Sequence, residues 1–178
     1  MWYCLQEFGY FIYSQVEISK TDVELTEYTP QAEITGEQMR QTMIALYFKN
    51  KDTGTLVPEA RNIDVKELTK EPYQILINLL IEGPKGEKLE KTIPEGTKVN
   101  KIERKGNVLW IDFSKEFIDN HKNGAEAESH TVYSIVNTMT QLNEVSSVKI
   151  VVDGKEDCAF LDNALSLKDI FVPKEEAI

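Results

Sequence analysis

Two carboxylates come closer to a catalytic arrangement than any other residues of this sequence. Asp112 and Glu116 lie four positions apart where a predicted strand ends, and such a pair could act as general acid and base. Ser114 lies between them, however, at the start of a helical turn. A hydroxyl there is typical of a helix N-cap, and a glutamate in the first turn interacts favourably with the helix dipole. We therefore predict a structural role for these residues, and no catalytic residue.

Metal ligands and reactive cysteines are equally sparse. The stretch from Asp119 to Gly124 resembles the start of a calcium loop, but the position that requires a bidentate glutamate holds His130. The two histidines, His121 and His130, have no second ligand type at short spacing, so we expect both to be solvated. Cys4 and Cys158 could form one disulfide or remain two separate thiols. The sequence predicts no metal site and no cofactor.

Composition limits the classes of partner. The chain has 178 residues, of which 41% are hydrophobic and 28% charged, enough for one substantial core. Its net charge of -10, with no local lysine or arginine cluster, would repel a phosphate backbone, so we expect no nucleic-acid partner. No run approaches the roughly 18 apolar residues of a membrane span. Any membrane attachment would need an anchor outside this sequence.

Periodicity predicts the elements that would position these residues. Alternating apolar residues predict strands, 3.6-residue periodicity predicts helices, and glycine and proline mark their ends. The expected order is a strand over 42–50, a strand over 56–65, a helix from Pro72 to Gly83, a hairpin over 93–117 that turns at 105–107, a helix over 125–142 and a strand over 146–154. This order predicts an α/β (α+β) fold, a two-layer sandwich in which two main helices pack on one face of a mixed β-sheet.

The chain divides into three parts by composition. Residues 1–40 form an N-terminal extension, with strand-like alternation over 10–28 followed by a stretch with the composition of a linker. The main domain spans 41–172, and 173–178 form a C-terminal tail.

The sheet face opposite the predicted core carries Tyr47 and Trp110, with Met43, Val108 and Val151. Two layers would leave this face bare, and a large apolar patch on a soluble monomer usually binds something. We favour cover by the aromatic N-terminal segment, with the part that stays exposed serving as a partner site.

Several segments together resemble the GerMN domain family, found in bacterial sporulation and spore-germination proteins and other envelope proteins. The resemblance covers about residues 43–165. The residues that carry it are Leu46-Tyr47-Phe48, Leu56-Val57-Pro58-Glu59 with Arg61, Leu79-Leu80 with Gly83-Pro84, Ile93 to Thr97, Val108 to Ser114, Val136-Asn137-Thr138, Val148, Asp153 and Gly154.

The resemblance implies an extracytoplasmic, non-enzymatic interaction module, often placed behind a lipoprotein or membrane anchor, with envelope or sporulation proteins as partners. The family's similarity to ring-building motifs leaves oligomerisation open. Glu59 and Arg61 match the family pattern and have two readings, an internal salt bridge or an arginine presented to a partner carboxylate. The predicted partner-binding residues are Trp110, Tyr47, Glu59, Arg61 and Asp112.

Two alternatives remain. A wall hydrolase, or an accessory of one, would need Asp112 or Glu116 in a cleft with a raised pKa. A peptidoglycan-binding protein would need exposed aromatic residues beside polar ones, as Trp110 stands beside Asp112.

Overall fold

The computed structural model describes residues 40–122, 124–160 and 165–174. The predictions made for residues 1–39, including the aromatic cover and Cys4, lie outside the described residues. So do residues 175–178 of the predicted tail.

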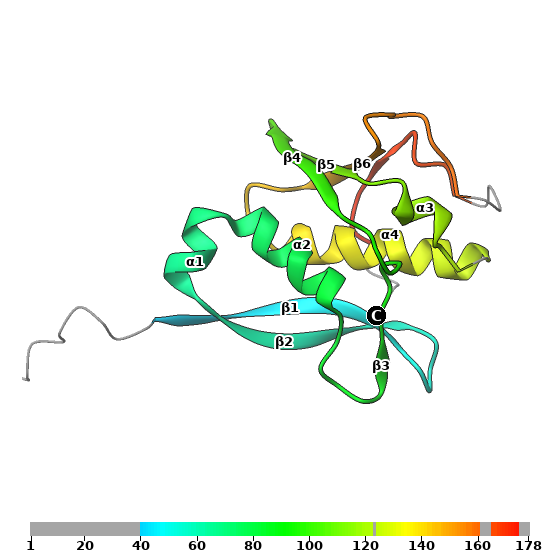
Figure 1. Cartoon of the computed structure of the whole chain (residues 1–178). Coiled ribbons are helices and arrows are strands. Elements are labelled where there is room, and N and C mark those ends of the chain that lie inside the picture. Colours follow the sequence, from blue (N-terminus) through cyan, green and yellow to red (C-terminus); the bar gives the residue numbers. More distant parts are fainter. Residues whose placement is uncertain (1–39, 123, 161–164, 175–178) are drawn as a thin grey trace, which may run out of the picture. The chain divides into compact units, whose positions relative to one another are not determined.

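The strands form two separate sheets (Figure 1). The first has the order β2-β1-β3 and is antiparallel, with β1 (Gln41–Asn50), β2 (Leu56–Asp64) and β3 (Leu89–Glu90). The second has the order β4-β5-β6-β7, with β4 (Val99–Lys105), β5 (Val108–Phe113), β6 (Ser147–Val152) and β7 (Ile170–Phe171). It is mixed, because β5 and β6 run parallel while its other pairs are antiparallel.

Two long helices lie between the sheets (Figure 1). They are α2 (Pro72–Glu82) and α4 (Ala125–Met139), accompanied by the short α1 (Val65–Lys70) and α3 (Glu116–Asp119). The predicted α/β sandwich with two main helices is confirmed. The strands do not share one sheet, however, because β1 and β2 lie on the far side of the helices from β4, β5 and β6.

A polar stripe on α4 explains why β1 does not join the second sheet. Where a neighbouring strand would pair with β1, Ser134 donates to the carbonyl oxygen of Tyr47 at 2.7 Å, and the Tyr47 N–H donates to Thr138 Oγ1 at 3.2 Å. One turn further on, the Ala45 N–H donates to Gln141 Oε1 at 3.0 Å. Buried backbone groups must be paired, and these side chains satisfy the β1 edge. The helix therefore takes the place of a strand.

One hydrophobic core joins both sheets to the helices. Alternate residues of β1, β5 and β6 and one face of α4 are fully buried: Leu46, Phe48, Leu109, Ile111, Phe113, Val148, Ile150, Val132, Ile135, Val136 and Met139. Ile44, on the same side of β1 as Leu46, is only partly buried. The hairpin of β4 and β5 turns at Gly106, whose φ of 64° suits glycine. Phe113 at its end stacks on Phe117 with ring centroids 4.5 Å apart. The prediction that this hairpin forms scaffold agrees with these contacts.

Residues near the C-terminus cover part of the outer face of the second sheet. Lys149 of β6 is 3% exposed, and its ammonium donates to the carbonyl oxygens of Glu156 at 2.9 Å, Leu167 at 2.8 Å and Lys168 at 2.5 Å. Three acceptors match the three protons of an ammonium group and compensate its loss of water. Burial lowers the pKa of Lys149, and the carboxylate of Glu156 opposes that shift.

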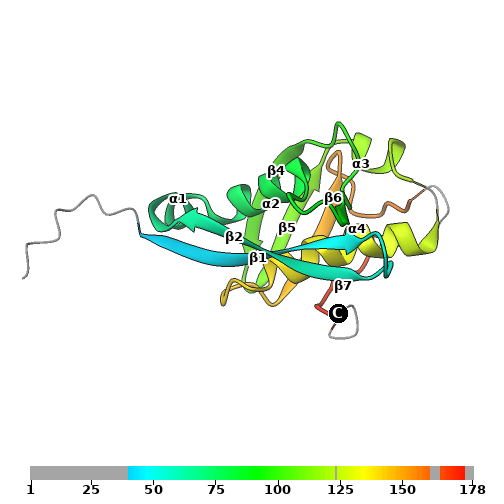
Figure 2. The ribbon, with the colours of Figure 1, turned by 90° about the horizontal axis from the view of Figure 1, so that it is seen from below.

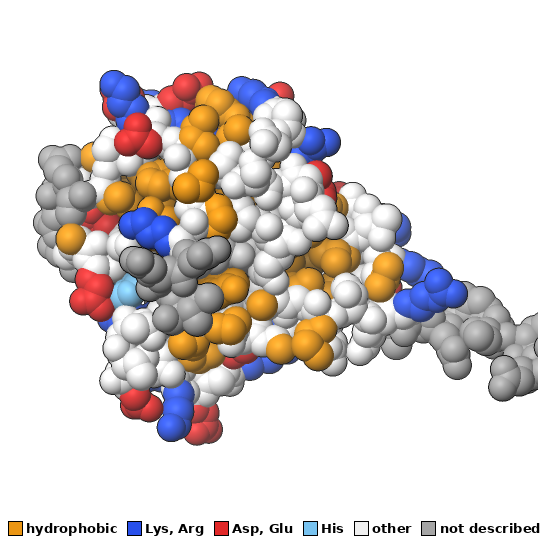
Figure 3. Space-filling view, turned by 180° about the vertical axis from the view of Figure 1, so that it is seen from behind, with side chains coloured by type: hydrophobic (Ala, Val, Ile, Leu, Met, Phe, Trp, Pro, Cys, Tyr) orange, Lys and Arg blue, Asp and Glu red, His pale blue; other side chains and the backbone are white. Residues whose placement is uncertain are grey.

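The back of the molecule carries β7 and two exposed apolar side chains near it. Ile170 is 51% exposed and Val172 59% exposed, and Lys174 lies over the ring of Tyr133, which also meets Phe171 edge-on. Seen from behind, hydrophobic side chains spread over this face while most charged ones lie at its margins (Figure 3).

Candidate functional site

The predicted partner-binding residues fall in three separate places. Tyr47 lies on β1 in the first sheet, whereas Trp110 and Asp112 lie on β5 in the second. Glu59 and Arg61 lie on β2, near the end of α2. The expected common face of Tyr47 and Trp110 is wrong, because α4 satisfies the edge of β1 and separates the two sheets.

Glu59 and Arg61 form an ion pair inside the fold. Their atoms Oε1 and Nη2 are 2.5 Å apart, and Arg61 Nη2 donates to Gly83 O at 3.0 Å. Burial alone raises the pKa of Glu59, but hydrogen bonds from the N–H groups of Gly86 and Lys85 and from Arg61 outweigh it and hold the pKa below its ordinary value. Because Arg61 is only 6% exposed, this geometry favours the internal ion pair over an arginine presented to a partner.

Trp110 and Asp112 lie together on the outer face of β5. Lys105 Nζ stands 3.8 Å from the centroid of the Trp110 ring, and Asp112 Oδ1 accepts from the Gly154 N–H at 3.0 Å. A shallow hollow of about 150 Å³ lies beside them, bordered by Glu103 among other charged groups. This face therefore presents a half-buried indole under a lysine and within a charged surface.

Glu116, the second carboxylate of the pair considered for catalysis, is stabilised in its charged form. Ser114 does not cap α3, because its hydroxyl accepts from the Lys98 N–H at 3.0 Å and α3 has no side-chain cap. The predicted N-cap is thus wrong. The Ser114 hydroxyl binds Glu116 instead and, together with the Glu116 backbone N–H, lowers the pKa of Glu116. A general acid needs the opposite shift.

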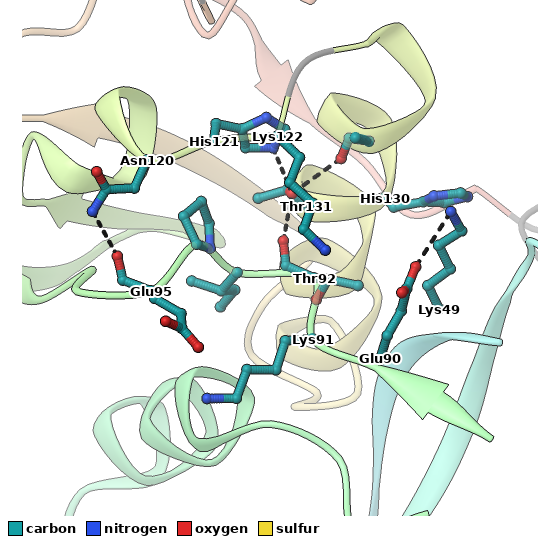
Figure 4. Close-up of a pocket in the computed structure, with 13 residues that line it drawn as sticks. Lys49, Glu90, Lys91, Thr92, Glu95, Asn120, His121, Lys122, His130 and Thr131 are labelled. Carbon is teal, nitrogen blue, oxygen red and sulfur yellow. Dashed lines mark hydrogen bonds and ion pairs between the residues drawn. The ribbon is translucent and has the colours of Figure 1, made fainter. Parts of the chain in front are cut away.

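A cleft of about 540 Å³ lies at the end of the helix layer, and sequence reasoning did not anticipate it (Figure 4). The segment after β3, residues 120–122 after α3, and the first turns of α4 form its walls. Its lining residues are Lys49, Glu90 to Glu95, Asn120 to Lys122, Ala127, His130 and Thr131.

Hydrogen bonds fix the floor of the cleft. Thr131 Oγ1 donates to Thr92 O at 2.6 Å and lies 2.8 Å from His121 Nε2 (Figure 4). Thr92 Oγ1 lies 2.7 Å from Ser134 Oγ. His121 also packs on Phe160, with ring centroids 4.4 Å apart, and is only 9% exposed. The predicted solvation of His121 is therefore wrong, because tertiary contacts bury its ring.

His130 lies at the other end of the cleft, beside an ion-paired lysine. Lys49 Nζ is 3.4 Å from Glu90 Oε1 and 3.8 Å from Glu126 Oε1, and His130 Nδ1 is 4.0 Å from the same Glu126 oxygen. The His130 side chain is 15% exposed, which corrects its predicted solvation, and its buried Nδ1 has no hydrogen-bond partner among the residues that the structure describes. Burial lowers the pKa of His130, and the charge of Lys49 lowers it further.

The spacing of polar residues along 131–141 was the sequence signal that could have indicated the floor of the cleft. Thr131, Ser134 and Thr138 on α4, and Gln141 just after its end, recur every three or four residues beside the apolar stripe. Three of these side chains are at most 1% exposed.

Within the described ranges, no group of three or more histidine, cysteine, aspartate or glutamate side chains could hold a metal ion. No helix among those residues is long and apolar enough to cross a membrane.

Comparison with known protein families shows to which family the chain belongs. The family described as Germane, sporulation and spore germination, matches residues 45–158. This chain belongs to that family. The match spans the hairpin, the cleft and both long helices.

Solved structures show the same fold. The tandem GerMN domains of the sporulation protein GerM from Bacillus subtilis align over 75% of this chain with a TM-score of 0.62 and 22% identity. The chain spans only 46% of that tandem structure. The first GerMN domain alone aligns over 72% of this chain and 99% of its own length, with a TM-score of 0.56 and 24% identity.

A third solved structure comes from Clostridium perfringens and is described as a lipoprotein candidate. It aligns over 76% of this chain and 89% of its own, with a TM-score of 0.50 and 25% identity. No curated protein matches the chain.

Proposed function

We propose that this chain is a non-enzymatic interaction module of the bacterial envelope, active in sporulation or spore germination, that binds a partner protein through the outer face of β1 and β2. The β1–β2 face, or strip, is the central part of that surface and consists of Met43, Ala45, Tyr47, Pro58, Ala60 and Asn62. By the same alternation, Lys49 continues it at one end and Asp64 at the other. The absence of charge from this exposed strip carries the proposal.

The strand register brings these six residues together. Alternate residues of a strand share a face, and Met43, Ala45 and Tyr47 pair with Asn62, Ala60 and Pro58 respectively. Met43 is 69% exposed, and all three β2 residues are exposed. Seen from below, no described helix or strand lies in front of β1 and β2 (Figure 2).

The strip contains no lysine, arginine, histidine, aspartate or glutamate, although 28% of the chain is charged. Centres of protein interfaces are depleted of charge, because charged groups lose water at a high cost when buried. A partner that presents a flat, uncharged and partly apolar surface can cover this strip without stripping water from an ion. Trp110 and Asp112 offer a second surface, but Lys105 and neighbouring charges would have to be displaced or paired there.

The cellular setting is part of the proposal. An extracytoplasmic position, with attachment through an anchor, is supported by the likeness to GerM and to the Clostridium perfringens lipoprotein candidate. The non-enzymatic role is supported by the lowered pKa of Glu116 and by the use of Asp112 to fix the turn at Gly154.

Charge placed on the strip tests the proposal. Wild-type chain, Met43→Asp and Val172→Asp would each be immobilised, and proteins retained from envelope extracts of sporulating cells would be quantified. Val172 is the matched control, since it is an exposed apolar residue of similar exposure, 59%, outside the strip. The proposal predicts a partner that Met43→Asp loses and Val172→Asp keeps. Equal retention by all three proteins, or equal loss from both variants, would contradict it.

A further inference from the structure

The cleft beside α4 has the properties of a prepared binding site. Hydrogen bonds that join Thr92, Thr131 and His121, with Ser134 bonded to Thr92, hold its floor in place, so the floor need not reorganise when a ligand arrives. Its volume of about 540 Å³ lies within the range typical of small-molecule sites, roughly 300–1,000 Å³. We infer that this cleft binds a short acidic peptide that carries a free amino group. The inference does not depend on the proposed protein partner.

The charges around the cleft indicate the ligand. Lys49 is occupied by Glu90 and Glu126, whereas Lys91 and Lys122 are exposed and make no ion pair with any described residue. Lys122 extends over the floor toward Thr92 (Figure 4). Two ammonium groups without counter-ions, in a chain of net charge -10, favour a ligand with carboxylates.

A peptide fits this arrangement better than a bare phosphate. Ile93, Pro94 and Ala127 give the wall an apolar part that a phosphate would not use. Glu95 lines the same cleft, is exposed and makes no ion pair with a described residue. Its carboxylate would repel a phosphate but would pair with an amine. Phosphate sites, moreover, usually rely on arginine or on clustered backbone N–H groups.

His130 gives the far end of the cleft a polar atom to offer. Its Nδ1 has no hydrogen-bond partner among the described residues, and because this atom is buried the ring would have to turn before a ligand amide or hydroxyl could satisfy it. Burial and the charge of Lys49 lower the pKa of His130, which favours the neutral imidazole, and a neutral imidazole can either donate or accept.

Titration of the full-length, ¹⁵N-labelled chain at low salt tests the inference. The probe is the tripeptide alanyl-glutamyl-alanine, which has one free amino group and two carboxylates, and alanyl-glutaminyl-alanine amide, which lacks both carboxylates, is its ligand control. We expect saturable chemical-shift changes confined to residues 90–95, 120–122 and 127–131 with the probe alone. No saturable change, or equal changes with the control peptide, would overturn the inference. Equally strong changes with inorganic phosphate would mark a general anion site and overturn it too.

A charge-reversal pair separates local recognition from overall charge. Lys122→Glu and Lys66→Glu change the net charge equally, but Lys66 is exposed on α1, outside the cleft. We expect about tenfold weaker binding or more for Lys122→Glu and less than about twofold for Lys66→Glu, because charge-assisted hydrogen bonds act at contact distance. The spectrum of each variant would confirm folding, and Lys122→Gln replaces the first if it fails to fold. Equal weakening by both variants would refute the site.

Discussion

Replacement of Ser134 by alanine tests how α4 completes the first sheet. Ser134 is fully buried, and its hydroxyl donates to Tyr47 O at 2.7 Å while lying 2.7 Å from Thr92 Oγ1. A serine hydroxyl has one proton, so Thr92 must donate to Ser134. Ser134→Ala would leave the Tyr47 carbonyl and the Thr92 hydroxyl without these partners.

The expected loss of stability follows from the unpaired Tyr47 carbonyl and Thr92 hydroxyl. Each buried polar group left unpaired costs about 1–3 kcal/mol, and alanine returns about 0.5 kcal/mol through its higher helix propensity. The Thr92 hydroxyl can rotate, which limits its share. We therefore expect Ser134→Ala to lower the free energy of unfolding by about 2–4 kcal/mol, a large fraction of the 5–15 kcal/mol typical of a domain.

Urea unfolding followed by far-UV circular dichroism measures this difference. Ser129→Ala is the matched control, because Ser129 lies half-buried on the same helix and its side chain makes no hydrogen bond with a described residue. The control should stay within about 0.5 kcal/mol of wild type, as is usual away from special contacts. If Ser134→Ala were equally mild, the view that α4 replaces a strand would be refuted.

Three further predictions concern the titratable side chains of Glu59, Lys149 and His130, which are buried or partly buried. Glu59→Gln should lower the free energy of unfolding by about 1–3 kcal/mol near neutral pH. The difference from wild type should shrink as pH falls below 4.5, because a carboxylate with a lowered pKa stabilises the fold only while it is ionised. A difference in unfolding free energy that does not change with pH would contradict this. Lys149→Met should speed amide hydrogen exchange in residues 165–171 but not in α4, because three carbonyl oxygens lose the Lys149 ammonium as their donor. Equal acceleration of exchange throughout the chain would argue against a stabilising effect of Lys149 confined to this segment. The imidazole of His130 should titrate below 6.5 by NMR, and Lys49→Gln should raise its pKa; a wild-type value at or above 6.5 would oppose the described burial.

Local signals predicted the hairpin and the helices well. Gly106 and the alternation around Trp110 lie within a few residues of one another, so turn geometry and register follow from neighbouring positions. Pro72 and Gly83 mark the two ends of α2 for the same reason. The family resemblance, with its order of short segments, is confirmed by the match over residues 45–158.

Features that depend on distant contacts escaped prediction. β3 and β7 have two residues each, too few to show any period. The assignment of β1 to a sheet of its own depends on polar α4 side chains about ninety positions away, beyond any local pattern. The cleft likewise needs Thr92 and Thr131 to meet across the fold, so its histidines looked like isolated surface residues.

Photo-crosslinking in sporulating cells tests the central claim most directly. A photoreactive amino acid would replace Tyr47 on the β1–β2 face in one strain and Trp110 on the second sheet in another. The account predicts a discrete crosslinked protein from position 47 and none from position 110. A discrete product from position 110 alone would contradict the account and move the contact surface to the face of Trp110 and Asp112.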